Sequence, residues 1–153
     1  MSDDCIFCLI LKKKSPASLV YEDDHVVAFM SNRPVNEGHT LVVPKKHYEN
    51  IYDIPDDEIA YLAKIVKRVA RAVRDAMSAE GIRVVQNNGS AAGQVIFHFH
   101  MHVIPIKPHE GFTHGKAYRD QSQGRMPEDI EIDAEKIRQK LSQPFELRNM
   151  SIC

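Results

Sequence analysis

Hydrophobic and polar residues alternate over short stretches in much of this chain, a period of two that is typical of β-strands. Turn residues and prolines separate the stretches: an acidic turn over residues 22–24, then Pro44 and Pro105, each end a run. Five strands are predicted on this basis, at residues 19–21, 25–30, 40–43, 82–86 and 95–104.

One longer segment follows a different period. Acidic residues at 56–58 favour a helix N-terminus, and apolar residues then recur every three or four positions up to Met77. The pattern predicts an amphipathic helix over residues 56–80, ended by Gly81, with its apolar face laid on the sheet. Short strands with one long helix between them predict an α+β fold.

The composition changes beyond Pro105, where Gly, Pro, Gln and charged residues become frequent. One short helix is predicted at residues 133–141, and the segment has too few apolar residues for a core of its own. We therefore expect one domain over residues 1–106. Residues 107–153 are expected to form a C-terminal extension packed on that domain or on a dimer partner.

Overall composition excludes several classes of protein. Of the 153 residues, 43% are hydrophobic and 27% are charged, which excludes a disordered chain. No apolar run approaches the ~20 residues that cross a bilayer, and neither a signal peptide nor a disulfide framework is evident. The net charge of −1 argues against generic DNA or RNA binding, which needs surplus cations. We expect a soluble cytoplasmic protein that binds neither membrane nor nucleic acid.

Three histidines alternate with apolar residues in the last predicted strand. Because strand side chains point to alternate faces, His98, His100 and His102 share one face. The opposite face, directed toward the helix, carries Phe97, Phe99, Met101 and Val103. A row of imidazoles suits either a metal site or a nucleophilic and acid–base site, and the spacing alone does not choose between them.

Hydrogen-bond donors surround this strand in the predicted fold. Gly93 and Gln94 lie just upstream, Asn87 lies in the facing turn, and His39 begins the third strand. Donors without a cluster of carboxylates suit an anionic substrate better than a hydrolytic metal ion.

The triad with its upstream Gly93-Gln94 resembles the His-x-His-x-His signature of the histidine-triad (HIT) superfamily of nucleotide hydrolases and transferases. Further segments similar to this family stand in the right order: Cys5-Ile6-Phe7-Cys8, Val20-Tyr21-Glu22-Asp23-Asp24, Ala28-Phe29-Met30 and Gly38-His39-Thr40-Leu41-Val42-Val43-Pro44-Lys45-Lys46-His47. The resemblance covers residues 5–106. It implies a five-stranded antiparallel sheet with one long helix packed on it, and a homodimer.

The resemblance also implies roles for single residues. His100 matches the family nucleophile, which attacks the α-phosphorus of a nucleotide while its other ring nitrogen donates to the backbone carbonyl of His98. His102 matches the histidine that contacts the phosphate, and His39 the one that approaches the triad from the neighbouring strand. Two amides match phosphate- and ribose-side contacts, those of Gln94 and Asn87.

One position departs from the family pattern. Many members place an acidic residue three positions before the proline that corresponds to Pro34, where it bonds the ribose hydroxyls; here that residue is Ser31. A carboxylate accepts from both hydroxyls at once, whereas serine is a weaker, single-point partner. The resemblance therefore implies a ribose contact at Ser31 with reduced preference for a ribonucleotide.

The two cysteines near the N-terminus have the spacing of a metal-ligand pair, although a lone Cys-x-x-Cys is also found in redox-active or inert pairs. A subset of the HIT family uses such a pair with two histidines, which here match His47 and His98. The resemblance thus implies a closed Cys₂His₂ set at Cys5, Cys8, His47 and His98 that holds a structural zinc ion, with no organic cofactor.

The predicted function is a nucleotide phosphohydrolase or nucleotidyl transferase with a purine nucleotide as substrate, either a nucleoside phosphoramidate or a dinucleotide polyphosphate. Two alternatives stay open. One is a nucleotide-binding regulatory protein whose hydrolysis is incidental, and the other is a metal-dependent hydrolase that uses the triad as ligands.

Overall fold

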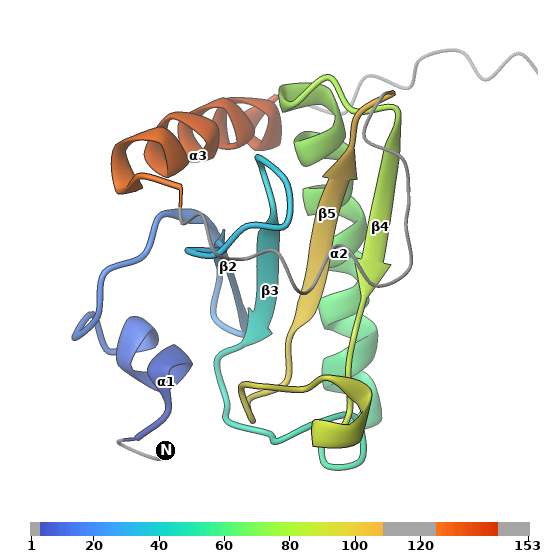
Figure 1. The fold of residues 1–153 in the computed structure, drawn as a ribbon. Helices are drawn as coiled ribbons and strands as arrows, with labels where there is room; N and C mark the ends of the chain where they lie inside the picture. The colour runs from blue at the N-terminus through green and yellow to red at the C-terminus, as the bar shows by residue number, and fades with distance from the viewer. Residues whose placement is uncertain (1–3, 109–124, 144–153) are drawn as a thin grey trace, which may run out of the picture.

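The computed structural model describes residues 4–108 and 125–143, and it forms a sheet with helices on both faces (Figure 1). In chain order the elements are α1 (Ile6–Leu11), β1 (Leu19–Glu22), β2 (Val26–Met30), β3 (Thr40–Pro44), α2 (Asp56–Ala76), β4 (Gly81–Val85), the 3-10 turn η1 (Ser90–Ala92), β5 (Met101–Ile106) and α3 (Pro127–Ser142). The sheet has five strands in the order β1-β2-β3-β5-β4, and every neighbouring pair is antiparallel. The predicted α+β fold is confirmed.

The central strands are buried on both faces. In β2, the side chains of Val26, Ala28 and Met30 join the core beneath α2, while those of Val27 and Phe29 join a second cluster beneath α1. A strand covered on both sides is uniformly apolar, because neither face is left to water. This explains why residues 26–30 show no polar alternation.

The main core lies between the sheet and the two longer helices. The apolar stripe of α2 packs on Phe99 and Val103, and α3 contributes Ile130, Ala134 and Ile137 to the same cluster. Part of the expected C-terminal extension therefore belongs to the same hydrophobic core as the sheet. The remainder of it, residues 109–124 and 144–153, lies outside the described residues.

Helix α1, which the sequence analysis did not predict, covers part of the opposite face of the sheet. Its Phe7 is buried against Phe29, with ring centroids 5.3 Å apart in an edge-to-face arrangement. Ile10 and Leu11 pack on the same cluster. The helix is short, and tertiary contacts stabilise it more than its own hydrogen bonds can.

The last strand begins later than predicted, and this corrects the expected strand over residues 95–104. Residues 95–100 form an irregular segment whose Phe99 amide donates to the Tyr48 carbonyl, 2.6 Å away. Phe97 is 40% exposed, so the expectation that it faces the helix was wrong, whereas Phe99 and Val103 do lie in that core.

Pro105 does not end this strand, contrary to prediction, because β3 pairs with β5 only as far as Val103. On the β3 side, the Pro105 carbonyl accepts a hydrogen bond from the Asn36 side chain at 2.9 Å. The N–H that proline lacks would point to this same side, where β3 offers no partner, so no hydrogen bond between strands is lost.

The boundaries of two helices also differ from prediction. Helix α2 ends at Ala76, and a turn with Ser78 at φ 51° leads to Gly81, which begins β4 rather than ending the helix. Helix α3 begins at Pro127, earlier than the predicted residue 133, because proline is well tolerated in the first helical turn. Within the described residues, no helix has both the length and the apolar character needed to cross a membrane.

Candidate active site and metal centre

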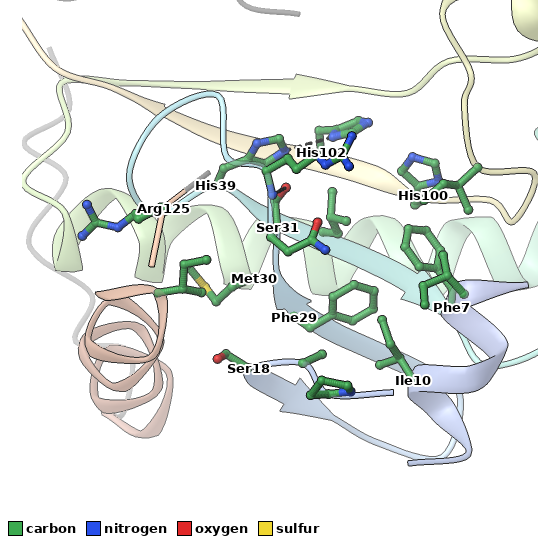
Figure 2. Close-up of a pocket in the computed structure, with 18 of the residues that line it drawn as sticks. Phe7, Ile10, Ser18, Phe29, Met30, Ser31, His39, His100, His102 and Arg125 are labelled. Carbon is green, nitrogen blue, oxygen red and sulfur yellow. Dashed lines mark hydrogen bonds between the residues drawn. The ribbon is translucent and has the colours of Figure 1, made fainter. Parts of the chain in front are cut away.

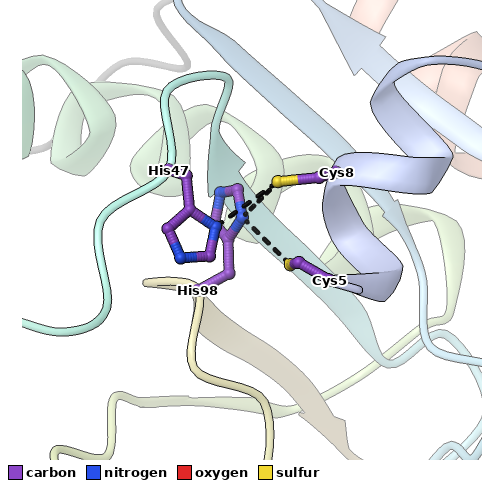
Figure 3. Close-up of side chains that lie close together, drawn as sticks. All are labelled: Cys5, Cys8, His47 and His98. Carbon is purple, nitrogen blue, oxygen red and sulfur yellow. Dashed lines mark hydrogen bonds between the residues drawn. The ribbon is translucent and has the colours of Figure 1, made fainter. Parts of the chain in front are cut away.

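Two cysteines and two histidines converge between α1 and the segment that precedes β5 (Figure 3). The Sγ atom of Cys5 lies 3.5 Å from Nδ1 of His98, and the Sγ atom of Cys8 lies 3.6 Å from the same nitrogen. His47, which follows β3, places its Nδ1 atom 3.4 Å from Cys8 Sγ. The structure therefore brings together all four predicted metal ligands, with their ligand atoms within 4.8 Å of one another.

The hydrogen bond on the far side of the His98 ring determines which of its nitrogens is a free electron-pair donor. Nε2 lies 2.8 Å from the Pro44 carbonyl oxygen, and a carbonyl only accepts, so Nε2 carries the proton. The unprotonated Nδ1 then faces the two thiols. A backbone carbonyl that fixes the tautomer of a ligating histidine is the usual outer support of a metal site.

This donor set fits zinc in both chemistry and size. Zn–S bonds of about 2.3 Å and Zn–N bonds of about 2.0 Å in a tetrahedron separate sulfur from nitrogen by roughly 3.5 Å, close to the observed distances. Burial, together with the neighbouring Cys5, raises the pKa of the Cys8 thiol. A bound dication reverses that effect because it stabilises the thiolate.

His100 is fixed in orientation by the segment that carries the metal cluster. Its Nδ1 lies 2.6 Å from the His98 carbonyl oxygen, so Nδ1–H donates and Nε2 keeps its lone pair. Burial lowers the pKa of His100, although the carbonyl bond acts in the opposite direction. The ring is therefore neutral near pH 7 and nucleophilic at Nε2.

His102 is held by a chain of hydrogen bonds that begins in the backbone. The Val35 amide donates to Nδ1 of His39 at 3.0 Å, so His39 carries its proton on Nε2. That Nε2–H donates to Nδ1 of His102, also at 3.0 Å, which leaves the His102 proton on its own Nε2. Burial lowers the pKa of His39 to about 3 and that of His102 to about 4, so both rings are neutral donors at pH 7.

His39, His100 and His102 line one pocket of about 650 Å³, a volume typical of sites for small ligands (Figure 2). Its walls are largely apolar and include Phe7 and Ile10 from α1 together with Phe29 from β2, which Phe7 contacts. Ser31, Asn32 and Arg33 form a polar part of the wall, so the predicted contact residue Ser31 lies in the same pocket as the triad.

Two predicted contact residues lie elsewhere. The Gln94 side chain accepts from the Gly89 amide at 2.8 Å and donates to the carbonyls of Glu49 and Ile96, so it holds the loop before β5 together. Asn87, in the turn after β4, is also absent from the described residues that line the pocket. Neither Gln94 nor Asn87 is therefore among the described residues that line the pocket.

Two parts of the pocket were not predicted from the sequence: the wall formed by α1, and Arg125, which lines the pocket next to α3. The run Ile6-Phe7-Cys8-Leu9-Ile10-Leu11 was the available signal for α1, since two apolar residues three positions apart, Phe7 and Ile10, share a helix face. No local pattern indicated Arg125.

Comparison with known proteins matches residues 12–109 to the family model described as the HIT domain. An adenylylsulfatase from Arabidopsis thaliana is 34% identical over 122 residues, which cover 80% of this chain and 62% of that protein. A hypothetical histidine triad nucleotide-binding protein from Sulfolobus tokodaii is 38% identical with a TM-score of 0.79, over 90% of this chain and 91% of that one. A zinc-bound histidine triad family protein from Mycobacterium smegmatis is 34% identical with a TM-score of 0.77, over 90% of this chain and 93% of that one.

The family match spans well over half of the chain, and the two solved structures extend the similarity over nine-tenths of it. Fold, triad and order of segments agree with the resemblance inferred from the sequence. This chain belongs to the HIT family.

Proposed function

We propose that this protein is a nucleotide phosphohydrolase or nucleotidyl transferase that acts at the α-phosphate through a covalent nucleotidyl-histidine at His100. The observation that carries this proposal is the 2.6 Å bond from His100 Nδ1–H to the His98 carbonyl oxygen. That bond leaves Nε2 as the unprotonated nitrogen of a neutral ring inside the pocket. An imidazole in this state is a competent nucleophile at neutral pH.

In the first step, His100 Nε2 forms a bond to the α-phosphorus, and the bond from phosphorus to the leaving group breaks. The leaving group departs with the electron pair and takes up a proton. In the second step, water attacks the phosphorus, the N–P bond breaks with its electron pair returning to His100 Nε2, and the nucleoside monophosphate is released. The proton that water gives up replaces the one that the leaving group took up. An acceptor other than water in the second step gives nucleotidyl transfer.

His102 supports both steps as a hydrogen-bond donor. Its Nδ1 accepts from His39, so the ring carries its proton on Nε2, and that Nε2–H would donate to a phosphate oxygen whose negative charge grows in the transition state. A preorganised donor of this kind typically contributes about 10²–10³ in rate. The apolar walls at Phe7 and Phe29 suit a planar purine base, which supports a purine nucleotide as substrate.

The Cys₂His₂ cluster would hold zinc as a structural ion. Its four protein ligands would fill a tetrahedral coordination sphere and would leave no open position for water or substrate. The ion would hold α1 to the segment that carries the triad, and so would keep the His98 carbonyl in place beneath His100. By family resemblance we also propose a homodimer, which sedimentation at micromolar concentration tests directly.

The geometry disfavours a metal ion bound by the triad itself. His98 belongs to the Cys₂His₂ cluster, and in the described part of the chain no metal-type cluster includes His100 or His102. The Nδ1 atom of His100 is bonded to the His98 carbonyl oxygen, and the Nδ1 atom of His102 is bonded to His39. The regulatory alternative rests on the departure at Ser31, whereas the orientation of His100 and His102 supports the enzymatic function.

The substrate class is proposed as nucleoside phosphoramidates or dinucleotide polyphosphates. The name of the adenylylsulfatase relative supports attack on an adenylyl group. A turnover panel of adenosine phosphoramidate, adenylyl sulfate and diadenosine polyphosphates, with and without chelator, tests the class.

His100→Gln should reduce turnover more than 1000-fold and leave nucleotide binding within a few-fold, because the loss is confined to the transition state. His25→Gln is the matched control, since His25 is exposed and lies outside the pocket. If His100→Gln kept more than about a tenth of wild-type turnover, a barrier change below ~1.4 kcal/mol, the nucleophile would be another group.

A further inference from the structure

The pocket carries positive charge at a place that the proposed reaction does not use. Apart from the histidines, the ionisable side chains among the described residues that line it are Arg33 and Arg125, and none of these lining residues is an aspartate or glutamate. A pocket with cations and no carboxylate favours an anionic group on its ligand.

Arg33 forms no ion pair within the part of the chain that the structure describes. Its backbone amide donates to Ser31 Oγ at 3.3 Å, a tight turn that places Ser31 and Arg33 together on the pocket wall. Its side chain is exposed.

Arg125 is held in place by two carboxylates outside the pocket lining. Nη1 lies 2.8 Å from Glu37, and Nη2 lies 3.0 Å from the buried Asp133. The Nε atom is buried and has no acceptor within the described residues. These two carboxylates offset the charge of Arg125, so Arg33 is the lining cation that an anionic ligand group would meet.

The order of groups in a nucleotide relates these arginines to the triad. If the α-phosphorus lies at His100 Nε2, the ribose follows directly through the 5′ oxygen, and the base lies beyond it. The apolar wall of Phe7, Ile10 and Phe29 suits the base, which leaves the polar segment from Ser31 to Arg33 for the ribose (Figure 2).

A site for unmodified ribose hydroxyls commonly offers a carboxylate, whereas a site for a ribose phosphate offers an arginine. We propose, resting on the proposed function, that the preferred substrate is a nucleotide that carries a second phosphate on its ribose, bound by Arg33. This explains the lack of a carboxylate at Ser31 as a feature of specificity.

Calorimetry on the wild-type protein tests the inference without turnover. Adenosine 3′,5′-bisphosphate or adenosine 2′,5′-bisphosphate should bind at least tenfold more tightly than adenosine 5′-monophosphate, as expected for a charge-assisted contact. The two bisphosphates distinguish the 3′ from the 2′ position. The preference should fall as salt is raised from 50 to 500 mM, since Arg33 is exposed to solvent.

Arg33→Gln should reduce that preference at least fivefold. Lys67→Gln removes the same charge from the exposed face of α2, on the other side of the sheet, and should leave the preference unchanged. Equal affinities of wild-type protein for the mono- and bisphosphates, or the same preference in Arg33→Gln as in wild type, would overturn the inference. The proposed function fails separately, if adenosine phosphoramidate and its ribose-phosphorylated forms are all bound but none is turned over.

Discussion

Replacing His39 by phenylalanine tests whether the hydrogen-bond chain to His102 controls the reaction. His39 is 3% exposed and makes two bonds, accepting from Val35 and donating to His102. The substitution removes the partners of the part-buried Val35 amide and of the buried His102 Nδ1, at up to ~1–3 kcal/mol each, while the phenyl ring recovers part of this by apolar burial. We expect the free energy of unfolding to fall by about 2–4 kcal/mol in guanidinium titrations.

His39→Phe should also lower turnover, for a reason separate from the loss of stability. Without His39 the His102 proton is free to move to Nδ1, and the Nε2–H that faces a phosphate oxygen is lost for part of the time. The expected decrease in kcat is about 100-fold, the effect of removing one donor to a developing negative charge. Nitrogen-15 spectra of the ring should show His102 changing from one tautomer to a mixture.

His39→Gln is the matched variant, because the glutamine amide places a donor near the position of the histidine Nε2. We expect it to keep kcat within tenfold of wild type and still to lose about 1–3 kcal/mol of stability through the Val35 amide. Equal loss of turnover in both variants, or an unchanged His102 tautomer in His39→Phe, would refute control of His102 by His39.

Three other outcomes are expected. Protein purified without chelator should contain one zinc ion per chain, and Cys8→Ser should lower zinc content, melting temperature and turnover together; unchanged stability in a metal-free protein would contradict the structural ion. Asp23 is buried in part, but bonds from the hydroxyls of Tyr61 and Tyr21 and from two backbone amides hold its pKa well below the usual range. Because the pKa of Asp23 is depressed in the folded state, the stability that it provides is present above pH ~4 and is lost as the pH falls below that value. Asp23→Asn should lower the free energy of unfolding by about 1–3 kcal/mol at pH 7, and this difference from wild type should be smaller in denaturation at pH 3. Gln94→Ala removes three loop bonds and should increase hydrogen exchange in residues 89–96; unchanged exchange would refute its role in that loop.

The strands and the long helix could be predicted from the sequence because their periodicity reflects which face is buried. The apolar stripe of α2 follows this rule closely, whereas residues 26–30 are apolar throughout because both faces of β2 are buried. The segment over residues 95–100 broke it, since its apolar alternation continued while the backbone bonded to Tyr48 instead of to a strand. A local pattern cannot indicate such a distant partner.

Single-residue roles were predictable to different degrees. The spacing of the triad and its resemblance to a family indicated His100 and the four metal ligands, which the fold does bring together. Which ring nitrogen carries the proton in His39 and His98 was not predictable, because it depends on hydrogen bonds with the Val35 amide and the Pro44 carbonyl. A pattern within one strand does not indicate these partners. The contacts of Arg125 depend on how α3 packs, which local sequence does not encode.

The stereochemical course at phosphorus tests the central claim, the covalent intermediate at His100, most directly. Each in-line displacement inverts the configuration, so attack by His100 followed by attack by water gives two inversions. With a substrate made chiral at the α-phosphorus by sulfur, hydrolysed in ¹⁸O-water, the account predicts net retention of configuration in the product. Net inversion would mean that water attacks the substrate directly, and it would contradict the account.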